Sequence, residues 1–418
     1  MAIPTSIILL CLLVFIVSPS LASSSASNEF PKSGFISLPV NIDPTTHQYF
    51  TSIGIGTPQH NMNLVIDLSE NVLWYECDKH YNSSSYKPLS CDSPMCPGGE
   101  FLTCSDCNGL HKPGCTNFTC GVSFSNPVSN FGFGGDLGQD FLFIPQIKKP
   151  HTHTFFSACA ETSRFPGIPI LKGLAKGIKG SLGLARNSPF ALQSQISSFY
   201  NINPPKFSLC LPSSKKGKLF IGGGPTFSAP LHQTEFSTVF SNYEYLFHLN
   251  SITINHKRVS FNTTDLLTDI KDNVATRIST LNVHPYTVLH PQLYNPFVKA
   301  FVRAAKGKNM KRVKKVEPFG ACYDAKTVGD VPQIDLVIES RFGKVNYDIS
   351  GHDSLVEVRK GVLCLAFVDR GMEALNGVQL GGYQLKDRIF EFDMSNSILR
   401  FSSSLVLQNK TCSDPSSL

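Results

Sequence analysis

One stretch decides the fold: Val65-Ile66-Asp67-Leu68-Ser69-Glu70-Asn71-Val72-Leu73-Trp74, residues 65–74. It predicts a buried apolar strand that carries one aspartate into a turn. A second copy of this pattern lies far downstream at Ala275-Thr276-Arg277-Ile278-Ser279-Thr280-Leu281, where Ser279 takes the position of the carboxylate. A hydrolase that works with two carboxyl groups needs both, because they share one proton and activate one water between them. One aspartate facing a serine cannot do this, so no catalytic residue is expected and Asp67 and Ser279 are interpreted as vestigial positions.

The N-terminus predicts export from the cell. Residues 7–17 form a short apolar run, and Ser20-Leu21-Ala22 places small residues at the two positions that a signal peptidase reads. A membrane anchor would need about 20 apolar residues, and this run is shorter. We therefore expect a signal peptide at residues 1–22 and a soluble, secreted mature chain.

The cysteines predict a disulfide framework. Removing Cys11 with the signal peptide from the thirteen cysteines leaves an even number, which in an oxidising compartment indicates six disulfides. Half of these cysteines lie within residues 91–120, where Cys104-Ser105-Asp106-Cys107 also has the spacing of a zinc or redox motif. No histidine stands at ligand spacing, so a disulfide-stapled loop without metal is the favoured interpretation, and sequence alone leaves its pairing open. The cysteines expected in disulfides are Cys77, Cys91, Cys96, Cys104, Cys107, Cys115, Cys120, Cys159, Cys210, Cys322, Cys364 and Cys412.

Asparagine sequons predict glycosylation. Four Asn-x-Ser/Thr triplets outside the signal peptide lack proline at the middle position: Asn82, Asn117, Asn262 and Asn409. In a secreted chain each predicts an exposed asparagine that can accept a glycan.

Length and composition predict two strand-rich domains. The mature chain is longer than a domain with a single hydrophobic core usually is. Near its middle, Gly222-Gly223-Gly224-Pro225 predicts a break between two domains. We expect an N-terminal lobe at 23–225, which includes the disulfide-rich loop 91–120, and a C-terminal lobe at 226–418. The 31 Gly, 27 Pro and 31 Phe, with only 16% charged residues, favour short strands joined by many turns. The net charge of +6 is too weak to indicate nucleic acid, and no motif for a cofactor is present.

One helix is well marked. Pro291 suits a first turn, Leu293, Phe297 and Phe301 repeat on one face, and Gly307 is a plausible terminator. From residue 299 to residue 315 the chain carries many basic residues and no acidic one. The basic residues are Lys299, Arg303, Lys306, Lys308, Lys311, Arg312, Lys314 and Lys315. A solvated helix face and loop is the simpler interpretation. Docking to an acidic partner or a pectin-like cell-wall polysaccharide is the alternative.

An internal repeat organises the chain. Asp67 is followed much later by Gly180-Ser181-Leu182-Gly183, and Ser279 by Val378-Gln379-Leu380-Gly381-Gly382. The pattern therefore predicts two strands in each half. The first strand carries Asp67 or Ser279, and the second is apolar and contains glycine. Glycine there allows another backbone to approach closely. Two such lobes would face each other across a cleft.

At these residues the chain resembles the pepsin-like aspartic proteases over nearly its whole mature length. Gly54-Ile55-Gly56-Thr57-Pro58, followed by Val65-Ile66-Asp67 and Leu73-Trp74, is similar to the opening of that family's N-terminal lobe. Residues 135–140 look like the strand after the active-site flap, although the preceding segment has no convincing flap tyrosine. The resemblance implies an all-β-dominated, bilobal pepsin-like fold with a few short helices and a central cleft.

The departures from the protease motif point to a subgroup. The proteases carry Asp-Thr/Ser-Gly-Ser/Thr in both lobes, whereas this chain has Asp67-Leu68-Ser69-Glu70 and Ser279-Thr280-Leu281-Asn282. This resembles the plant extracellular dermal glycoproteins, basic 7S globulins, and inhibitors of xylanase and xyloglucan-specific endoglucanase. The supporting motifs are Phe207-Ser208-Leu209-Cys210-Leu211-Pro212, Gly222-Gly223-Gly224-Pro225, Ile278-Ser279-Thr280 with Pro285-Tyr286-Thr287-Val288-Leu289, Phe319-Gly320-Ala321-Cys322-Tyr323, and Leu380-Gly381-Gly382-Tyr383-Gln384-Leu385 with Phe392-Asp393. The resemblance implies Cys210–Cys412 and Cys322–Cys364 disulfides, no enzymatic activity, and a location in the plant cell wall or apoplast.

The resemblance also implies a mechanism. In the subgroup's inhibitors, loops of the C-terminal lobe enter the cleft of a microbial glycoside hydrolase, and a basic side chain pairs with its catalytic acids. The corresponding loops here are residues 324–330 and 406–411, which offer Lys326 and Lys410. Three alternatives stay open: both are ordinary surface lysines, the protein is a non-inhibitory storage-type binding glycoprotein, or Asp67 and Ser279 hold a water in a residual protease.

Overall fold

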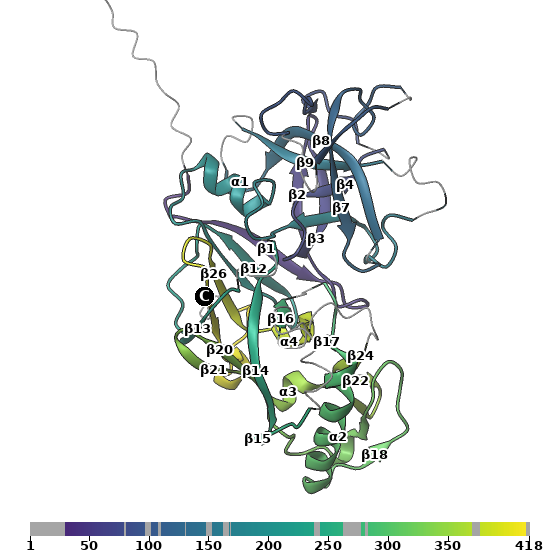
Figure 1. The fold of residues 1–418 in the computed structure, drawn as a ribbon, viewed down its shortest axis with the longest axis vertical. Coiled ribbons are helices and arrows are strands. Elements are labelled where there is room, and N and C mark those ends of the chain that lie inside the picture. Colours follow the sequence, from purple (N-terminus) through teal and green to yellow (C-terminus); the bar gives the residue numbers. More distant parts are fainter. Residues whose placement is uncertain are drawn as a thin grey trace, which may run out of the picture.

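The computed structural model in Figure 1 describes residues 30–78, 81–96, 102–107, 110–129, 131–147, 153–161, 167, 169–237, 243–261, 277–280, 283–369 and 377–414. The expected signal peptide at 1–22 and the sequon at Asn262 lie outside the described residues. In the described part of the chain, no helix is long and apolar enough to cross a membrane.

Strands dominate the structure, and most of them belong to one 15-stranded sheet. Its order is β13-β27-β26-β11-β12-β1-β2-β3-β10-β4-β9-β8-β7-β6, with β5 paired to β8. The strands are β1 (Ile36–Ile42), β2 (Tyr49–Ile55), β3 (His60–Asp67), β4 (Trp74–Glu76), β5 (Lys87–Pro88), β6 (Leu102–Ser105), β7 (Thr119–Asn126), β8 (Phe131–Phe143), β9 (Thr154–Ala160), β10 (Ile178–Gly183), β11 (Lys206–Cys210), β12 (Lys216–Ile221), β13 (Leu231–Glu235), β26 (Ile389–Asp393) and β27 (Ile398–Ser402).

Two smaller sheets in the second half of the chain, together with the helices, complete the described structure. The eight-stranded sheet contains β14 (Leu246–Ile254), β15 (Lys257–Arg258), β16 (Arg277–Thr280), β17 (Thr287–Leu289), β20 (Ile334–Ser340), β21 (Gly343–Ile349), β24 (Phe367–Asp369) and β25 (Val378–Leu380). The four-stranded sheet contains β18 (Arg312–Val313), β19 (Cys322–Asp324), β22 (Leu355–Arg359) and β23 (Val362–Leu365). The helices are α1 (Leu192–Phe199), α2 (Pro291–Gly307), α3 (Gly351–Ser354) and α4 (Gly382–Leu385), with 3₁₀ turns η4 (Ala325–Thr327) and η6 (Leu405–Gln408).

The large sheet joins the two ends of the chain. β11 pairs with β26 from Lys206↔Asp393 to Cys210↔Ile389, so strands from both halves lie side by side in the middle of the molecule (Figure 1). The expected domain boundary at 225/226 falls between β12 and β13, which belong to this same sheet. The boundary therefore stays a prediction.

The internal repeat predicted from the sequence is confirmed by the strand pairing. In the first half, β10 lies between β3, to which it is parallel, and β4, to which it is antiparallel. In the second half, β25 lies in the same way between β16 and β17. In each half a further strand, β9 or β24, then pairs in parallel with β4 or β17.

Glycine makes these crossed strands possible. A Cβ atom on Gly180 would lie 2.0 Å from the Trp74 carbonyl oxygen, and one on Gly381 would lie 2.2 Å from the Tyr286 carbonyl carbon. Both obstacles are backbone atoms held in a sheet, so neither can move aside cheaply. The close approach expected from the glycine pattern is therefore present in both halves.

The predicted helix is present as α2, with Leu293, Phe297 and Phe301 buried. It also ends at Gly307 as expected, but that glycine does not reverse the chain. Asn309 has the left-handed conformation (φ 60°), and the Met310 N–H donates to the Ala305 carbonyl oxygen at 3.1 Å. This is the Schellman pattern, in which asparagine replaces the more usual glycine.

Six disulfides fasten the strands and loops. The Cys210–Cys412 and Cys322–Cys364 bridges implied by the resemblance are both present. The remaining pairs, which the sequence left open, are Cys77–Cys159, Cys91–Cys104, Cys96–Cys120 and Cys107–Cys115. Three of these lie wholly within the loop 91–120, so that loop is closed mostly on itself.

Gly180→Ala tests the close approach. The added methyl group would overlap the Trp74 backbone, so the free energy of unfolding should fall by about 3 kcal/mol or more. Gly132→Ala is the matched control, because a Cβ there meets no atom within 4 Å, and its effect should stay within about 0.5 kcal/mol. Urea unfolding followed by the fluorescence of the single tryptophan, which is buried, measures both. Equal stabilities of the two variants would contradict the assignment.

Candidate functional site

Asp67 ends β3 and turns back on its own loop. It is 2% exposed, and its Oδ1 accepts hydrogen bonds from the Ser69 N–H (2.8 Å), the Ser69 hydroxyl (2.7 Å) and the Glu70 N–H (3.3 Å). Its Oδ2 is buried and has no hydrogen-bond partner in the structure. Burial raises the pKa of the Asp67 carboxyl, and the hydrogen bonds from Ser69 and Glu70 oppose that shift.

Glu70 connects this turn to the β7–β8 hairpin. Its Oε2 accepts hydrogen bonds from the backbone N–H (2.8 Å) and the hydroxyl (3.1 Å) of Ser125 in β7. Its Oε1 accepts from the Asn71 N–H at 2.9 Å. One side chain therefore holds together two segments that are 55 residues apart in the sequence.

A second carboxyl group thus lies in the first half of the chain beside Asp67. Burial, followed by the nearby charge of Asp67, raises the pKa of Glu70 to about 8, although hydrogen bonds from Ser125 and Asn71 lower it. The sequence analysis treated Glu70 only as a departure from the protease motif and missed this role. The available signal was its position between the buried strand that ends at Asp67 and the apolar run Val72-Leu73-Trp74.

The β7–β8 hairpin contacts the same turn through an aromatic stack. The ring of Phe124 lies 5.1 Å from the ring of Trp74 at an interplanar angle of 25°. Trp74 is fully buried, and its indole Nε1 has no hydrogen-bond partner in the structure. β7 carries no tyrosine, as noted from the sequence, and the hairpin stacks on Trp74 through the apolar ring of Phe124.

Ser279 lies in β16, between β14 and β25. It is 2% exposed, and its hydroxyl has no hydrogen-bond partner in the structure. Asp67 lies opposite Gly183, the last residue of β10, whereas Ser279 lies opposite Gln379, two residues before Gly381. The two strands are thus not in matching register, and the equivalence of Ser279 to Asp67 stays a prediction.

The two candidate lysines occupy different parts of the second half. Lys326 is exposed in the 3₁₀ turn η4, where its backbone N–H donates to Asp324 Oδ1 at 3.1 Å. Lys410 is half-buried after η6, and its ammonium donates to the Ser228 hydroxyl at 3.2 Å. In the described part of the chain, no hydrogen bond, ion pair or disulfide joins the loops 324–330 and 406–411.

Three of the four sequons lie in the described part of the chain, and all three asparagines are exposed: Asn82, Asn117 and Asn409. Asn117 accepts a hydrogen bond from the Cys107 N–H at 3.2 Å, so its side chain is tied to the disulfide loop. Asn409 caps η6 in the left-handed conformation (φ 55°), beside Lys410. Glycan attachment at these positions remains a prediction.

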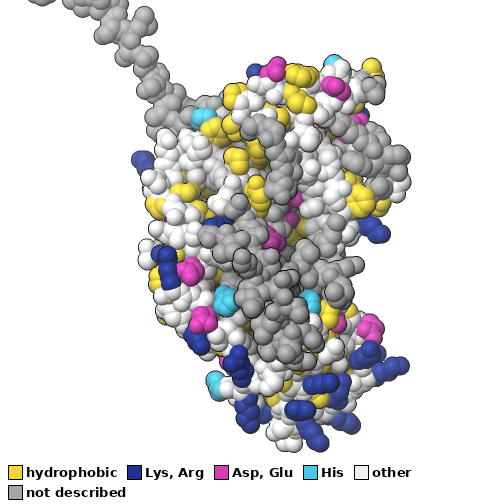
Figure 2. All heavy atoms as spheres, in the orientation of Figure 1, with side chains coloured by type: hydrophobic (Ala, Val, Ile, Leu, Met, Phe, Trp, Pro, Cys, Tyr) yellow, Lys and Arg dark blue, Asp and Glu magenta, His cyan; other side chains and the backbone are white. Residues whose placement is uncertain are grey.

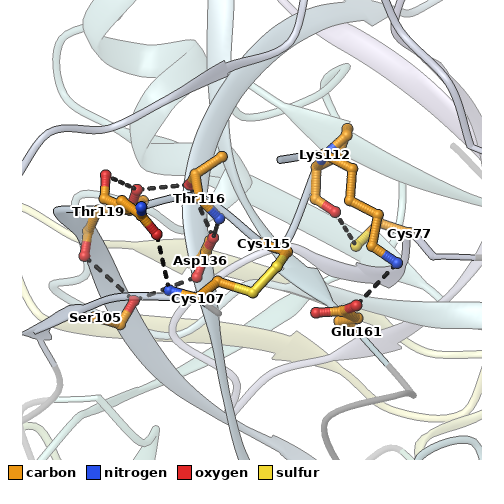
Figure 3. Close-up of a disulfide and its surroundings, with 11 residues drawn as sticks. Cys77, Ser105, Cys107, Lys112, Cys115, Thr116, Thr119, Asp136 and Glu161 are labelled. Atoms are coloured by element: carbon orange, nitrogen blue, oxygen red, sulfur yellow. Dashed lines mark hydrogen bonds and ion pairs between the residues drawn. A yellow bond between two sulfur atoms is a disulfide. The ribbon is translucent and has the colours of Figure 1, made fainter. Parts of the chain in front are cut away.

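The disulfide loop offers no metal site at its best candidate position. Sulfur atoms of Cys107 and Cys115 lie within 4.8 Å of a Glu161 carboxylate oxygen, but they are bonded to each other and are not thiolates (Figure 3). Glu161 instead pairs with Lys112 at 2.9 Å. Asp136 accepts from the Thr116 N–H and hydroxyl, both at 3.0 Å, which anchors the loop to β8. These contacts describe a structural staple.

Two strand-rich halves, each built around a glycine-bearing crossed strand and joined by a shared sheet, define a pepsin-like scaffold. The chain belongs to the TAXi family of xylanase-inhibitor-like proteins. A family model described as "Xylanase inhibitor N-terminal" matches residues 49–223, and one described as "Xylanase inhibitor C-terminal" matches residues 244–403.

Relatives and solved structures agree with this family. The chain is 35% identical to a "Probable aspartic proteinase GIP2" of Nicotiana benthamiana (97% of this chain, 96% of that one) and 32% identical to a "Gamma conglutin 1" of Prunus dulcis (97% and 94%). It superposes on the crystal structure of edgp with a TM-score of 0.79 at 33% identity (92% and 98% covered), and on soybean basic 7S globulin with 0.77 at 27% (91% and 98%). The predicted subgroup and the strand-dominated pepsin-like fold are confirmed.

Glu70→Gln tests the buried carboxyl by its effect on pH dependence. Folding raises the pKa of Glu70 from 4.5 to about 8, so the folded protein holds a proton there that the unfolded chain releases. Stability from this group is therefore complete below pH 4.5 and is lost as the pH rises to about 8. The variant should flatten this decline by on the order of 5 kcal/mol, measured by urea unfolding across that range.

The control is Glu317→Gln, because Glu317 is exposed and forms an ion pair with exposed Lys315. Its pH dependence should match that of the unaltered protein. An unchanged slope in Glu70→Gln would show that Glu70 is ionised throughout this range.

Proposed function

We propose that the protein is a secreted, proteolytically inactive glycoprotein that inhibits microbial cell-wall-degrading glycoside hydrolases, either xylanase or xyloglucan-specific endoglucanase. The match to both xylanase-inhibitor family models carries this proposal. Six disulfides suit the oxidising extracellular space, and we place the protein in the plant cell wall or apoplast.

The residues around Asp67 and Ser279 lack the second carboxyl group that proteolysis needs. The segment Arg277-Ile278-Ser279-Thr280-Leu281-Asn282 has no carboxylate, so a shift of register within it cannot supply a second aspartate. Glu70 cannot replace it, since both its oxygens accept hydrogen bonds from its own half of the chain. In a pepsin-like protease two carboxyl groups share one proton and bind one water between them. The hydrogen bonds of Glu70 do not place it in such a pair.

Lys326 is the favoured inhibitory residue. η4 is fixed by Asp324, which caps it, and by Thr327, whose hydroxyl donates to the Asp324 carbonyl at 2.8 Å and accepts from the Lys311 N–H at 2.9 Å. The side chain of Lys326 is exposed and forms no ion pair with any residue that the structure describes. A retaining glycosidase carries two carboxyl groups about 5 Å apart, and a lysine between them would form charge-assisted hydrogen bonds with both.

Lys410 is the second candidate. Its loop is anchored by the Cys210–Cys412 disulfide, but its ammonium already donates to Ser228. A glycan on neighbouring Asn409 would also stand in the way of a protein partner. We therefore assign Lys410 the smaller share of the inhibitory contact.

A non-inhibitory cell-wall or storage-type binding glycoprotein is the second candidate function. Relatives named basic 7S globulin and gamma conglutin favour it, as does the separation of the loops that carry Lys326 and Lys410. Its partner would be an acidic cell-wall polysaccharide held by the basic residues of α2 and the segment after it.

The decisive experiment measures reducing-sugar release by fungal xyloglucanase and xylanase with increasing amounts of the purified glycoprotein. Dose-dependent loss of one activity supports inhibition and names the target class. Full activity across a broad panel of hydrolases would favour the binding glycoprotein.

Alanine substitution tests the inhibitory lysines. Lys326→Ala should weaken inhibition about tenfold or more, because it leaves buried carboxylates of the hydrolase without a partner, and Lys410→Ala should weaken it by less. Lys326→Arg should retain inhibition, and Lys344→Ala, at an exposed position in β21, should have no effect. Inhibition constants measured against the sensitive hydrolase decide. If neither loop variant differs from Lys344→Ala, the contact lies elsewhere.

Ser279→Asp tests the loss of proteolysis. The variant should not digest casein at acid pH, because Ser69, Glu70 and Leu281 also depart from the protease motif. Pepstatin-sensitive digestion by the unaltered protein would overturn the assignment as a non-enzyme.

A further inference from the structure

A groove of about 500 Å³ lies between α2 and the β14–β15 hairpin. This volume is within the range of about 300–1,000 Å³ that is typical of ligand sites. Ala300, Ala304 and Gly307 line its helix side, and their small size leaves the space open. Buried Ile254 lines the hairpin side, so the groove has an apolar surface at its base.

Cations surround this groove from both sides. Lys257 and Arg258 come from β15, while Arg303 and Lys308 come from α2 and its C-cap, and no lining residue is acidic. Figure 2 shows Lys and Arg side chains gathered at the end of the molecule where Figure 1 places α2 and β15. The potential over the groove is therefore positive.

Most of these cations are not neutralised within the described part of the chain. Lys308 pairs with Asp330, whereas Lys257, Arg258 and Arg303 are exposed and have no acidic partner among the described residues. Lys299 and Lys306 extend the stripe of Arg303 along α2 at helical spacing and are likewise exposed. A surface with this excess of unpaired charge attracts anions.

The hairpin holds its two cations in place. Asn255 and His256 form a tight turn with positive φ angles of 47° and 61°. The Asn255 side chain accepts from the Gln333 N–H at 3.0 Å, and the Arg258 guanidinium donates to the Asn250 carbonyl at 3.4 Å. Lys257 and Arg258 are thus presented by a backbone that needs little reorganisation on binding.

We propose that this groove binds a carboxylated polysaccharide, with Lys257, Arg258 and Arg303 contacting uronate carboxylates. Guanidinium groups match the planar carboxylate, and the small aliphatic residues offer a surface for the faces of sugar rings. No aromatic residue lines the groove, so the stacking that single-stranded nucleic acid requires is missing. The proposal deepens the second candidate function by naming its site, and it does not depend on hydrolase inhibition.

The test is binding to immobilised polygalacturonate at low ionic strength. The triple variant Lys257→Gln, Arg258→Gln, Arg303→Gln should bind about tenfold more weakly, because three of the contacts are removed. A second triple variant with the same loss of charge, Lys215→Gln, Lys216→Gln, Lys218→Gln on the β11–β12 hairpin, should bind as the unaltered protein does. The charge-preserving variant Lys257→Arg, Arg258→Lys, Arg303→Lys should also bind, which separates charge from side-chain shape.

The outcomes are distinct. Binding that weakens with salt, fails on fully methyl-esterified polymer and is lost only in the groove variant supports the proposal. Equal weakening in both glutamine triples, or equal binding of the esterified polymer, overturns it. Xyloglucanase inhibition is measured in parallel: the groove variant should inhibit normally, and Lys326→Ala should lose inhibition but still bind polygalacturonate.

Discussion

The close contact of backbone against backbone at Gly180 and Gly381 is the constraint on which the rest of the structure depends. Each glycine lets one strand cross directly beside the turn-bearing strands of its half, with no side chain between them. That crossing fixes where β3 and β16 end, and therefore where Asp67 and Ser279 lie. The shared sheet then holds the halves together through β11 and β26. The hydrophobic cores of both halves pack around this geometry.

The polar turn at Asp67 organises the structure around it. Asp67 organises its own loop through Ser69, and Glu70 extends the network to Ser125 of the neighbouring hairpin. A buried carboxyl is tolerated when hydrogen bonds compensate for its lost hydration, and a raised pKa lets it avoid carrying charge. Glu70 thus connects the turn after β3 to strand β7 through hydrogen bonds.

The features that could be predicted from the sequence are those determined by residues close together in the chain. The strand around Asp67, the glycine-bearing strands and the apolar face of α2 all follow from residue spacing within short windows. The contact of Glu70 with Ser125 did not follow, since 55 residues separate them and only the folded hairpin brings them together. Pairings inside the loop 91–120 were equally open, because cysteine spacing does not determine which sulfur atoms meet. The charged groove combines β15 with a helix much later in the chain, and sequence analysis saw only the helix side of it.

The Cys210–Cys412 disulfide has a consequence for a chain that is cut between its two halves. It closes a loop of 202 residues and joins the end of β11 to the chain just after η6. A protease that cuts once between β12 and β26 would leave two fragments that remain covalently connected and share a continuous sheet. Such a nicked molecule would keep its two halves in register and would separate only after reduction.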